Sequence, residues 1–173
     1  DDWGFRFNLV CGDSLLHGVG AQASFGWHDF DHVYQTESQG DLTRILKPGY
    51  YHAVVANPPY ITPKDKAQND AYRERYSACH RQYSLAVPFM QRLFQLAQSG
   101  HLADPRSGGF VGQITANSFM KREFGKKLIE EYFAGRGGSP GQDLTHVIDT
   151  SGAYIPGHGT PTVILFGRHR APV

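Results

Sequence analysis

Apolar and polar positions along this chain change period several times, from strand-like runs to helix-like repeats. Short runs of β-branched and aromatic residues predict strands, and apolar residues recurring every three or four positions predict helices. The expected strands are residues 6–11, 51–56, 109–115, 144–149 and 162–166. The expected helices are residues 85–98 and 118–133, with a weaker one at 65–77. This alternation predicts an α/β fold with a mostly parallel sheet and covering helices.

Four residues, Asn57, Pro58, Pro59 and Tyr60, directly follow the expected strand at residues 51–56, whose apolar character predicts a buried position. Neither proline has a backbone N–H, so the ladder ends here and the backbone is fixed at the carboxyl end of the strand. Open α/β sheets bind ligands at that end. Asn57 offers an amide oxygen from an extended backbone, and Tyr60 offers an aromatic face. The four residues predict a rigid pocket for a planar group that carries an NH2.

Such a pocket suits methyl transfer to an exocyclic amine. The lone pair of adenine N6 is delocalised into the ring, so this nitrogen is a poor nucleophile. Acceptors for both N6 hydrogens, here the Asn57 side chain and the Pro58 carbonyl, favour a tetrahedral nitrogen whose lone pair is free for in-line attack. The step needs positioning and preorganised dipoles rather than a strong base. Tyr60 would stack on the base, a contact worth about 1–3 kcal/mol in single-strand recognition.

The motif at Asn57 to Tyr60 resembles the catalytic motif of amino-group methyltransferases that use S-adenosylmethionine. Residues 108–119 resemble the next strand and turn of N6-adenine DNA methyltransferases, and residues 118–127 and 154–167 resemble the PglX methyltransferases of BREX-type bacterial phage-defence systems. The resemblance implies transfer of a methyl group from S-adenosylmethionine to adenine N6 in DNA. It also implies other phage-defence proteins as partners, with Pro59 stiffening the catalytic turn.

The resemblance further implies a Rossmann-like methyltransferase sheet with helices on both faces. That sheet is incomplete, because the first two strands and the glycine-rich cofactor loop of the family have no counterpart before Asp13. In the family, the acid matching Asp13 accepts a hydrogen bond from the cofactor; as an alternative, Asp13 caps the next turn. We expect residues 1–173 to form part of one catalytic domain. The strand at residues 51–56 then becomes an edge, which invites self-association.

Other functions remain open. Enzymes that methylate a protein glutamine at N5 share the four-residue motif, because the glutamine amide resembles the adenine amino group, and some RNA methyltransferases share it too. A non-catalytic domain that binds DNA or a defence partner is a further possibility. The plainest alternative is a proline-terminated strand and turn without a chemical role.

Charged and aromatic residues elsewhere predict substrate contacts. Lys64 and Lys66 begin a basic segment, interleaved with tyrosines, that would lie over the mouth of the site and contact phosphates. The further cations of this segment are Arg73, Arg75, His80 and Arg81. In the family, the region matching residues 154–162 lies near the flipped base, so Tyr154 is expected to form a second aromatic wall. The alternative there is a glycine-rich connection to the last strand.

Composition indicates a single cytoplasmic domain. The chain has 173 residues, 40% of them hydrophobic, without an apolar run long enough for a membrane or a signal-peptide pattern. Its two cysteines, Cys11 and Cys79, argue against a disulfide framework. The net charge of +1 is weak evidence about partners. Two histidines and two aspartates within residues 28–32 lack flanking structure that would fix metal ligands, so we expect a polar loop and no metal.

Overall fold

The fold was analysed in a computed structural model, which describes residues 4, 7–17, 39–101, 103–104, 106–153 and 159–173. The chain divides into two compact units, Asp1–Pro48 and Gly49–Val173. Each unit is described by itself. No helix among the described residues is long and apolar enough to cross a membrane.

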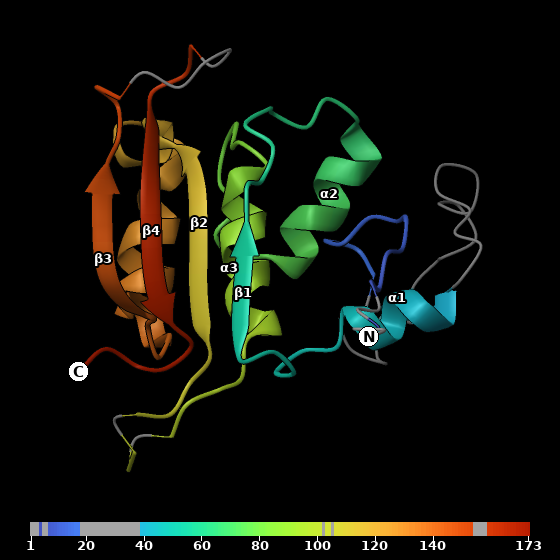
Figure 1. Cartoon of the computed structure of the whole chain (residues 1–173). Helices are drawn as coiled ribbons and strands as arrows, with labels where there is room; N and C mark the ends of the chain where they lie inside the picture. Colours follow the sequence, from blue (N-terminus) through green and yellow to red (C-terminus); the bar gives the residue numbers. More distant parts are fainter. Residues whose placement is uncertain (1–3, 5–6, 18–38, 102, 105, 154–158) are drawn as a thin grey trace. The chain divides into compact units, whose positions relative to one another are not determined.

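The larger unit is built on a four-stranded sheet with the order β1-β2-β4-β3 (Figure 1). The strands are β1 (Ala53–Ala56), β2 (Phe110–Ala116), β3 (Asp143–Asp149) and β4 (Thr162–Arg168). β1 and β2 are parallel, whereas β4 runs antiparallel to both β2 and β3. All four strands were predicted from the hydrophobic pattern, and their ends differ by only one or two residues.

The sheet is less parallel than predicted because β3 and β4 are neighbours in both sequence and space. Their antiparallel pairing continues beyond β3, where the Thr150 N–H donates to the Thr162 carbonyl (3.1 Å) and the two hydroxyl groups lie 2.8 Å apart. A short connection joins antiparallel neighbours, whereas parallel strands need a long crossover. The hydrophobic pattern of a strand predicts which of its faces is buried, but it does not predict whether the strand pairs parallel or antiparallel with its neighbour.

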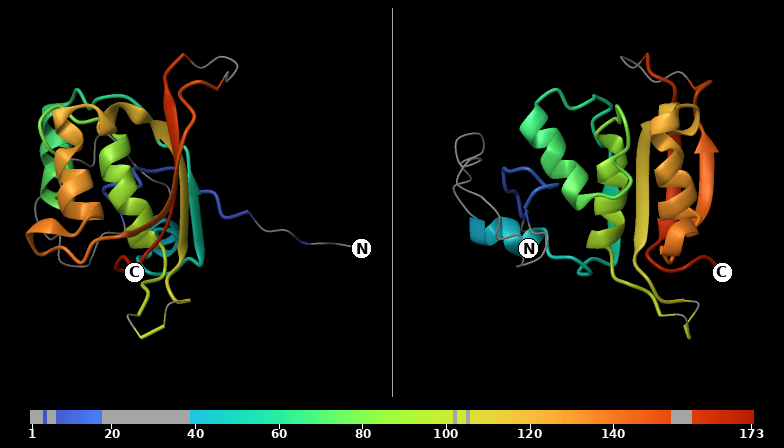
Figure 2. Two further views of the ribbon diagram at one scale, coloured as in Figure 1. Left: turned by 90° about the vertical axis from the view of Figure 1, so that its left-hand side faces the viewer. Right: turned by 180° about the vertical axis from the view of Figure 1, so that it is seen from behind.

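Three helical segments pack on one face of this sheet (Figure 2). They are α2 (Lys66–Arg75), α3 (Ala86–Leu96) and the π-helical η4 (Leu128–Phe133). Phe94 of α3 is 1% exposed and packs edge-on against Phe133, with 5.9 Å between ring centroids. Gly167 of β4 leaves room for this ring, because a Cβ there would lie 2.8 Å from Phe94 Cζ. The Rossmann-like α/β class is confirmed, but in this unit the described helices cover one face and not both.

The opposite face of the sheet exposes apolar side chains. Val55 is 81% exposed, Phe110 58% and Phe166 43%.

Parallel register places Ala56 of β1 beside Gln113 of β2, and β1 lies at the edge of the sheet as expected. The prediction that the residues before Asn57 are buried is therefore wrong: an edge strand with one uncovered face cannot exclude solvent from its apolar positions.

The predicted helices differ in how well they form. α2 confirms the weaker prediction and begins directly after Asp65, whose side chain accepts the Gln68 N–H at 2.7 Å as an N-cap. α3 confirms the helix predicted at residues 85–98, and Pro88 lies in its first turn. A continuous helix at residues 118–133 is wrong. The segment instead contains η2 (Asn117–Met120), η3 (Glu123–Gly125) and η4, and the 3₁₀ turn η5 (Arg136–Gly138) follows.

The predicted helix is interrupted before Gly125, at Arg122, whose backbone is extended (φ −120°, ψ 150°). The chain turns back so tightly that an added Cβ would lie 1.8 Å from the Phe119 carbonyl oxygen. Two aromatic side chains on either side of this turn, Phe119 and Phe124, are buried. The turn therefore brings Gly125 against the Phe119 backbone, with both rings buried.

The smaller unit contains one described helix, α1 (Gln39–Ile45), which the sequence pattern did not predict. Leu42 in this helix and Leu15 in the preceding turn are buried. The strand predicted at residues 6–11 is wrong for its described part, since residues 7–11 form no strand. Phe7 is 76% and Leu9 is 86% exposed. An apolar run becomes a strand only where a neighbour supplies hydrogen bonds, so its pattern alone does not decide the outcome.

Candidate functional site

Asn57, Pro58, Pro59 and Tyr60 form a corner at the carboxyl end of β1, hereafter the Asn57–Tyr60 corner. Asn57 is exposed, Pro58 is buried and Tyr60 is half-buried. Pro58 therefore anchors the corner in the protein while Asn57 faces outward. This arrangement leaves the side-chain amide accessible to a ligand.

A hydrogen bond joins the first and last residues of this corner. The Tyr60 hydroxyl donates to Asn57 Oδ1 over 2.9 Å. Burial raises the pKa of the Tyr60 phenol, so the hydroxyl stays protonated at neutral pH and can keep donating. The bond orients the Asn57 carboxamide, whose oxygen has a second lone pair for another donor. The sequence predicted an aromatic wall at Tyr60 but gave no sign of this contact.

The chain after the corner is fixed to α3. The Ile61 carbonyl accepts the Leu85 N–H, at the start of α3, over 2.8 Å, and Pro63 is buried. These contacts restrict the corner from both sides, since β1 precedes it and a bonded segment follows it. A site that acts by positioning benefits from such rigid support.

β2 contributes polar groups toward the same end of the sheet as the Asn57–Tyr60 corner, because β1 and β2 are parallel. Gln113 and Thr115 are 3% and 0% exposed, and Asn117 follows at 6%. Within the described residues, both amide atoms of Gln113 and the Thr115 hydroxyl lack hydrogen-bond partners. The Asn117 N–H donates to the Pro161 carbonyl, which holds the chain before β4 at this end of the sheet.

Asp13 lies in the smaller unit and caps a turn. Its Oδ1 atom accepts the Leu15 N–H at 2.8 Å and the Leu16 N–H at 3.2 Å. Asp13 therefore has the turn-capping role that is the alternative to cofactor binding. Capping fixes the orientation of the carboxylate and is compatible with a further contact, so the cofactor role of Asp13 remains a prediction.

The other predicted substrate contacts divide into three groups. Lys64 and Lys66 are exposed in and beside the first turn of α2, close in sequence to the Asn57–Tyr60 corner. Arg73 and Arg75 instead donate hydrogen bonds to backbone carbonyls of their own unit. Tyr154 lies outside the described residues, as do the histidines and aspartates of residues 28–32.

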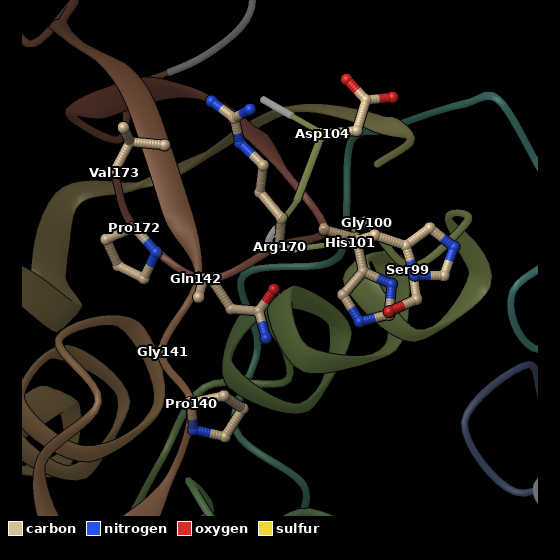
Figure 3. Close-up of a pocket in the computed structure, with 12 residues that line it drawn as sticks. Ser99, Gly100, His101, Asp104, Pro140, Gly141, Gln142, Arg170, Pro172 and Val173 are labelled. Carbon is tan, nitrogen blue, oxygen red and sulfur yellow. The ribbon is translucent and has the colours of Figure 1, made fainter. Parts of the chain in front are cut away.

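Two cavities lie at the opposite end of the sheet, where β1 and β2 begin. One has a volume of about 410 Å³ and the other about 550 Å³. Figure 3 shows the first, with the Gln142 carboxamide turned into it from the start of β3 and Arg170 beside it. Arg170 forms an ion pair with Asp143 at 2.6 Å. Neither of these two cavities is lined by the Asn57–Tyr60 corner.

Comparison with known proteins relates the chain to methylases. Residues 20–134 match the Eco57I restriction-modification methylase family. Over 94% of its length the chain is 55% identical to the adenine-specific methyltransferase PglX of Streptomyces coelicolor, of which it spans 14%. It is 31% identical to the type II methyltransferase M.PaeR7I of Pseudomonas aeruginosa, over 56% of this chain and 16% of that protein.

Solved structures show the same fold. A modification subunit of a putative type I restriction enzyme from Vibrio vulnificus superimposes with a TM-score of 0.53 at 14% identity. The match covers 72% of this chain and 24% of that protein. The family match spans well over half of the chain and includes the whole Asn57–Tyr60 corner. The chain therefore belongs to the Eco57I restriction-modification methylase family.

Proposed function

We propose that this chain supplies the target-amine site of an enzyme that methylates adenine N6 in DNA. The observation that carries the proposal is the accessible Asn57 carboxamide, held by Tyr60 at the carboxyl end of β1. Family membership supports it, as does similarity to the adenine-specific methyltransferase PglX of Streptomyces coelicolor. Because the chain spans 14% of that relative, the activity is proposed for the full-length protein.

The residues of the corner would act on the amine by accepting hydrogen bonds from its two N–H groups. Asn57 Oδ1 and the Pro58 carbonyl would each accept one N6 hydrogen, which localises the lone pair on nitrogen. The new N–C bond forms as the bond from the methyl carbon to its leaving sulfur breaks, and one N6 proton then passes to solvent. Preorganised acceptors stabilise the positive charge that develops on N6.

The chemistry of these groups fits a methyl donor that is already activated. Asn57 and Pro58 offer neutral amide groups and Tyr60 a neutral phenol, so none of them can activate a methyl group. S-adenosylmethionine, when bound, would supply an electrophilic methyl group on a sulfonium. Asp13 is the residue of this chain proposed to contact it, through the carboxylate that the adjoining turn orients.

Lys64 and Lys66 are proposed to contact the DNA, with Tyr154 forming part of the base pocket. An adenine inside a duplex must be flipped out to reach such a site, at a cost of a few kcal/mol. Stacking on Tyr60 would offset part of that cost. The predicted partnership with other phage-defence proteins rests on the family resemblance alone.

The test is transfer of labelled methyl groups by the full-length protein and its Asn57→Ala variant. We expect the variant to lose about 100- to 1000-fold in turnover, as for other lost preorganised groups, while calorimetry shows cofactor affinity nearly unchanged. Thr62→Ala, an exposed change two residues beyond the corner, is the control and should transfer normally. Normal turnover by Asn57→Ala would defeat the mechanism, and label in a protein glutamine instead of DNA would defeat the substrate assignment.

A further inference from the structure

The segment between α2 and α3, residues 76–85, contains an unusual backbone conformation. Arg81 has φ of 53°, and among the described residues it is the one non-glycine residue with positive φ. A left-handed arginine is disfavoured and persists only where surrounding contacts hold it. Its side chain is exposed. The structure therefore fixes the backbone at Arg81 while presenting its guanidinium group to solvent.

Arg73, on α2, holds this conformation. Its guanidinium group donates to the carbonyl of Arg81 and, over 3.3 Å, to the carbonyl of Cys79. The same group lies over the ring of Tyr83, with 5.1 Å between Arg73 Cζ and the ring centroid. One planar cation thus binds two backbone carbonyls within the segment and stacks on an aromatic ring, a geometry that lysine cannot reproduce.

Asn69 completes the arrangement from the preceding turn of α2. Its Oδ1 atom accepts hydrogen bonds from Arg73 Nε at 3.1 Å and from the Tyr83 hydroxyl at 2.8 Å. We call Asn69, Arg73 and Tyr83, with the two carbonyls that they hold, the Arg73 network. The donors of Arg73 bind groups of the protein itself, so Arg73 supports the segment although part of its side chain is exposed.

This segment is fixed beside the candidate site. The Ala78 N–H donates to Gln91 Oε1 of α3 at 2.9 Å. At the other end, Leu85 donates to the carbonyl of Ile61, the residue after Tyr60. Arg81 is therefore four residues from a direct hydrogen bond to the chain that leaves the Asn57–Tyr60 corner.

The charges around the segment favour an anionic partner. Between residues 64 and 81 the sequence has five lysines and arginines and three acids. One of the acids, Asp65, caps α2. Within the part of the chain that the structure describes, no hydrogen bond or ion pair is recorded for the Arg81 guanidinium. Lys64 and Lys66 are exposed on the same segment of sequence.

We propose that Arg81 contacts a backbone phosphate of the DNA beside the target adenine, and that Arg73 is the residue that positions it. This inference rests on the proposed function, whose substrate contacts it specifies. Arginine forms a planar, bidentate match to phosphate oxygens. A guanidinium whose backbone is already fixed loses less entropy on binding than one on a mobile loop.

The experiment measures the salt dependence of DNA binding by the full-length protein, using a fluorescent 30-base-pair duplex. Each phosphate contact contributes a slope of about 0.9 in log affinity against log salt. We expect Arg81→Gly, which tolerates positive φ, to reduce the slope by about 0.9 and affinity by about fivefold at 0.15 M salt. Arg81→Lys should keep most of the parental salt slope and most of the parental affinity. Lys126→Ala, an exposed cation near η4, is the matched control and should leave both unchanged.

Arg73→Lys separates positioning from direct contact. The change keeps the positive charge but loses the planar guanidinium group that binds two carbonyls. We therefore expect the salt slope to fall as it does in Arg81→Gly. A variant that combines Arg73→Lys with Arg81→Gly should lose little more. A parental slope in Arg73→Lys would overturn the positioning role. A parental slope in Arg81→Gly, or an absence of DNA binding by the parent protein, would overturn the phosphate contact. Methyl transfer to DNA is measured separately. If the parent protein transfers methyl groups but Arg81→Gly keeps the parental salt slope, this inference alone is refuted. If Arg81→Gly lowers the slope but the parent protein transfers no methyl group, the proposed function alone is refuted.

Discussion

Tyr60→Phe separates the two roles that the structure gives to Tyr60. The change removes the hydroxyl that donates to Asn57 Oδ1 over 2.9 Å and keeps the aromatic ring. A hydrogen bond of this kind contributes about 0.5–1.5 kcal/mol net. If its role is to orient the Asn57 amide in the transition state, about 1 kcal/mol corresponds to about a fivefold loss in kcat/KM.

Tyr60→Ala removes the ring as well and should cost more. Stacking contributes about 1–3 kcal/mol per base, which adds about a 5- to 150-fold loss to that of Tyr60→Phe. The assay is transfer of labelled methyl groups to adenine-containing DNA by the full-length protein, with kcat and KM measured for both variants. Tyr50→Phe, an exposed tyrosine at the other end of the sheet, is the control.

The pH profile provides a second readout. Because burial raises the pKa of the Tyr60 phenol above its ordinary value, the hydroxyl should remain a donor at neutral and mildly alkaline pH. The ratio of the parent rate to the Tyr60→Phe rate should therefore be flat over that range and shrink only at the higher pH where the phenol ionises. Equal rates for parent and Tyr60→Phe would refute the orienting role, and equal losses for both Tyr60 variants would refute stacking.

Two further predictions concern the folded chain. Gly125→Ala should destabilise it by about 1–3 kcal/mol in urea unfolding, because the new Cβ would meet the Phe119 carbonyl, whereas Gly152→Ala, with open space around it, should change little; equal effects would contradict the steric argument. Burial raises the pKa of the Cys79 thiol to about 12, so at pH 8 Ellman's reagent should modify exposed Cys11 quickly and Cys79 only after unfolding. Since the raised pKa favours the protonated thiol in the folded state, this stabilisation is complete below pH 9 and is lost as the pH rises towards 12; a flat stability profile there would show that Cys79 ionises without unfolding.

Several features could be predicted from the sequence because their causes are local. The four strands of the sheet and the helices α2 and α3 follow from hydrophobic period, β-branched content and an N-cap at Asp65. The Asn57–Tyr60 corner follows from the inability of Pro58 and Pro59 to extend a ladder. Four residues with this chemistry, placed after a strand, already indicated an amine-binding site.

Other features depend on neighbours that lie far away in the sequence. Residues 7–11 have the pattern of a strand but form none, and the helix predicted at residues 118–133 is interrupted at Arg122, just before Gly125. The first outcome depends on whether a pairing strand is available and the second on a close approach to Phe119. Neither is encoded in the period of the segment itself.

The sequence by itself determined the chemical types at the site: acceptor oxygens, two stiff prolines, an aromatic ring and nearby cations. Only the tertiary structure decided how they are used. It joined the Tyr60 hydroxyl to Asn57 and divided the basic segment into Arg73, which binds backbone, and Arg81, which faces solvent. Charge and hydrogen-bonding capacity belong to a residue, but its partner depends on distance and direction, and these are fixed only when the helices pack.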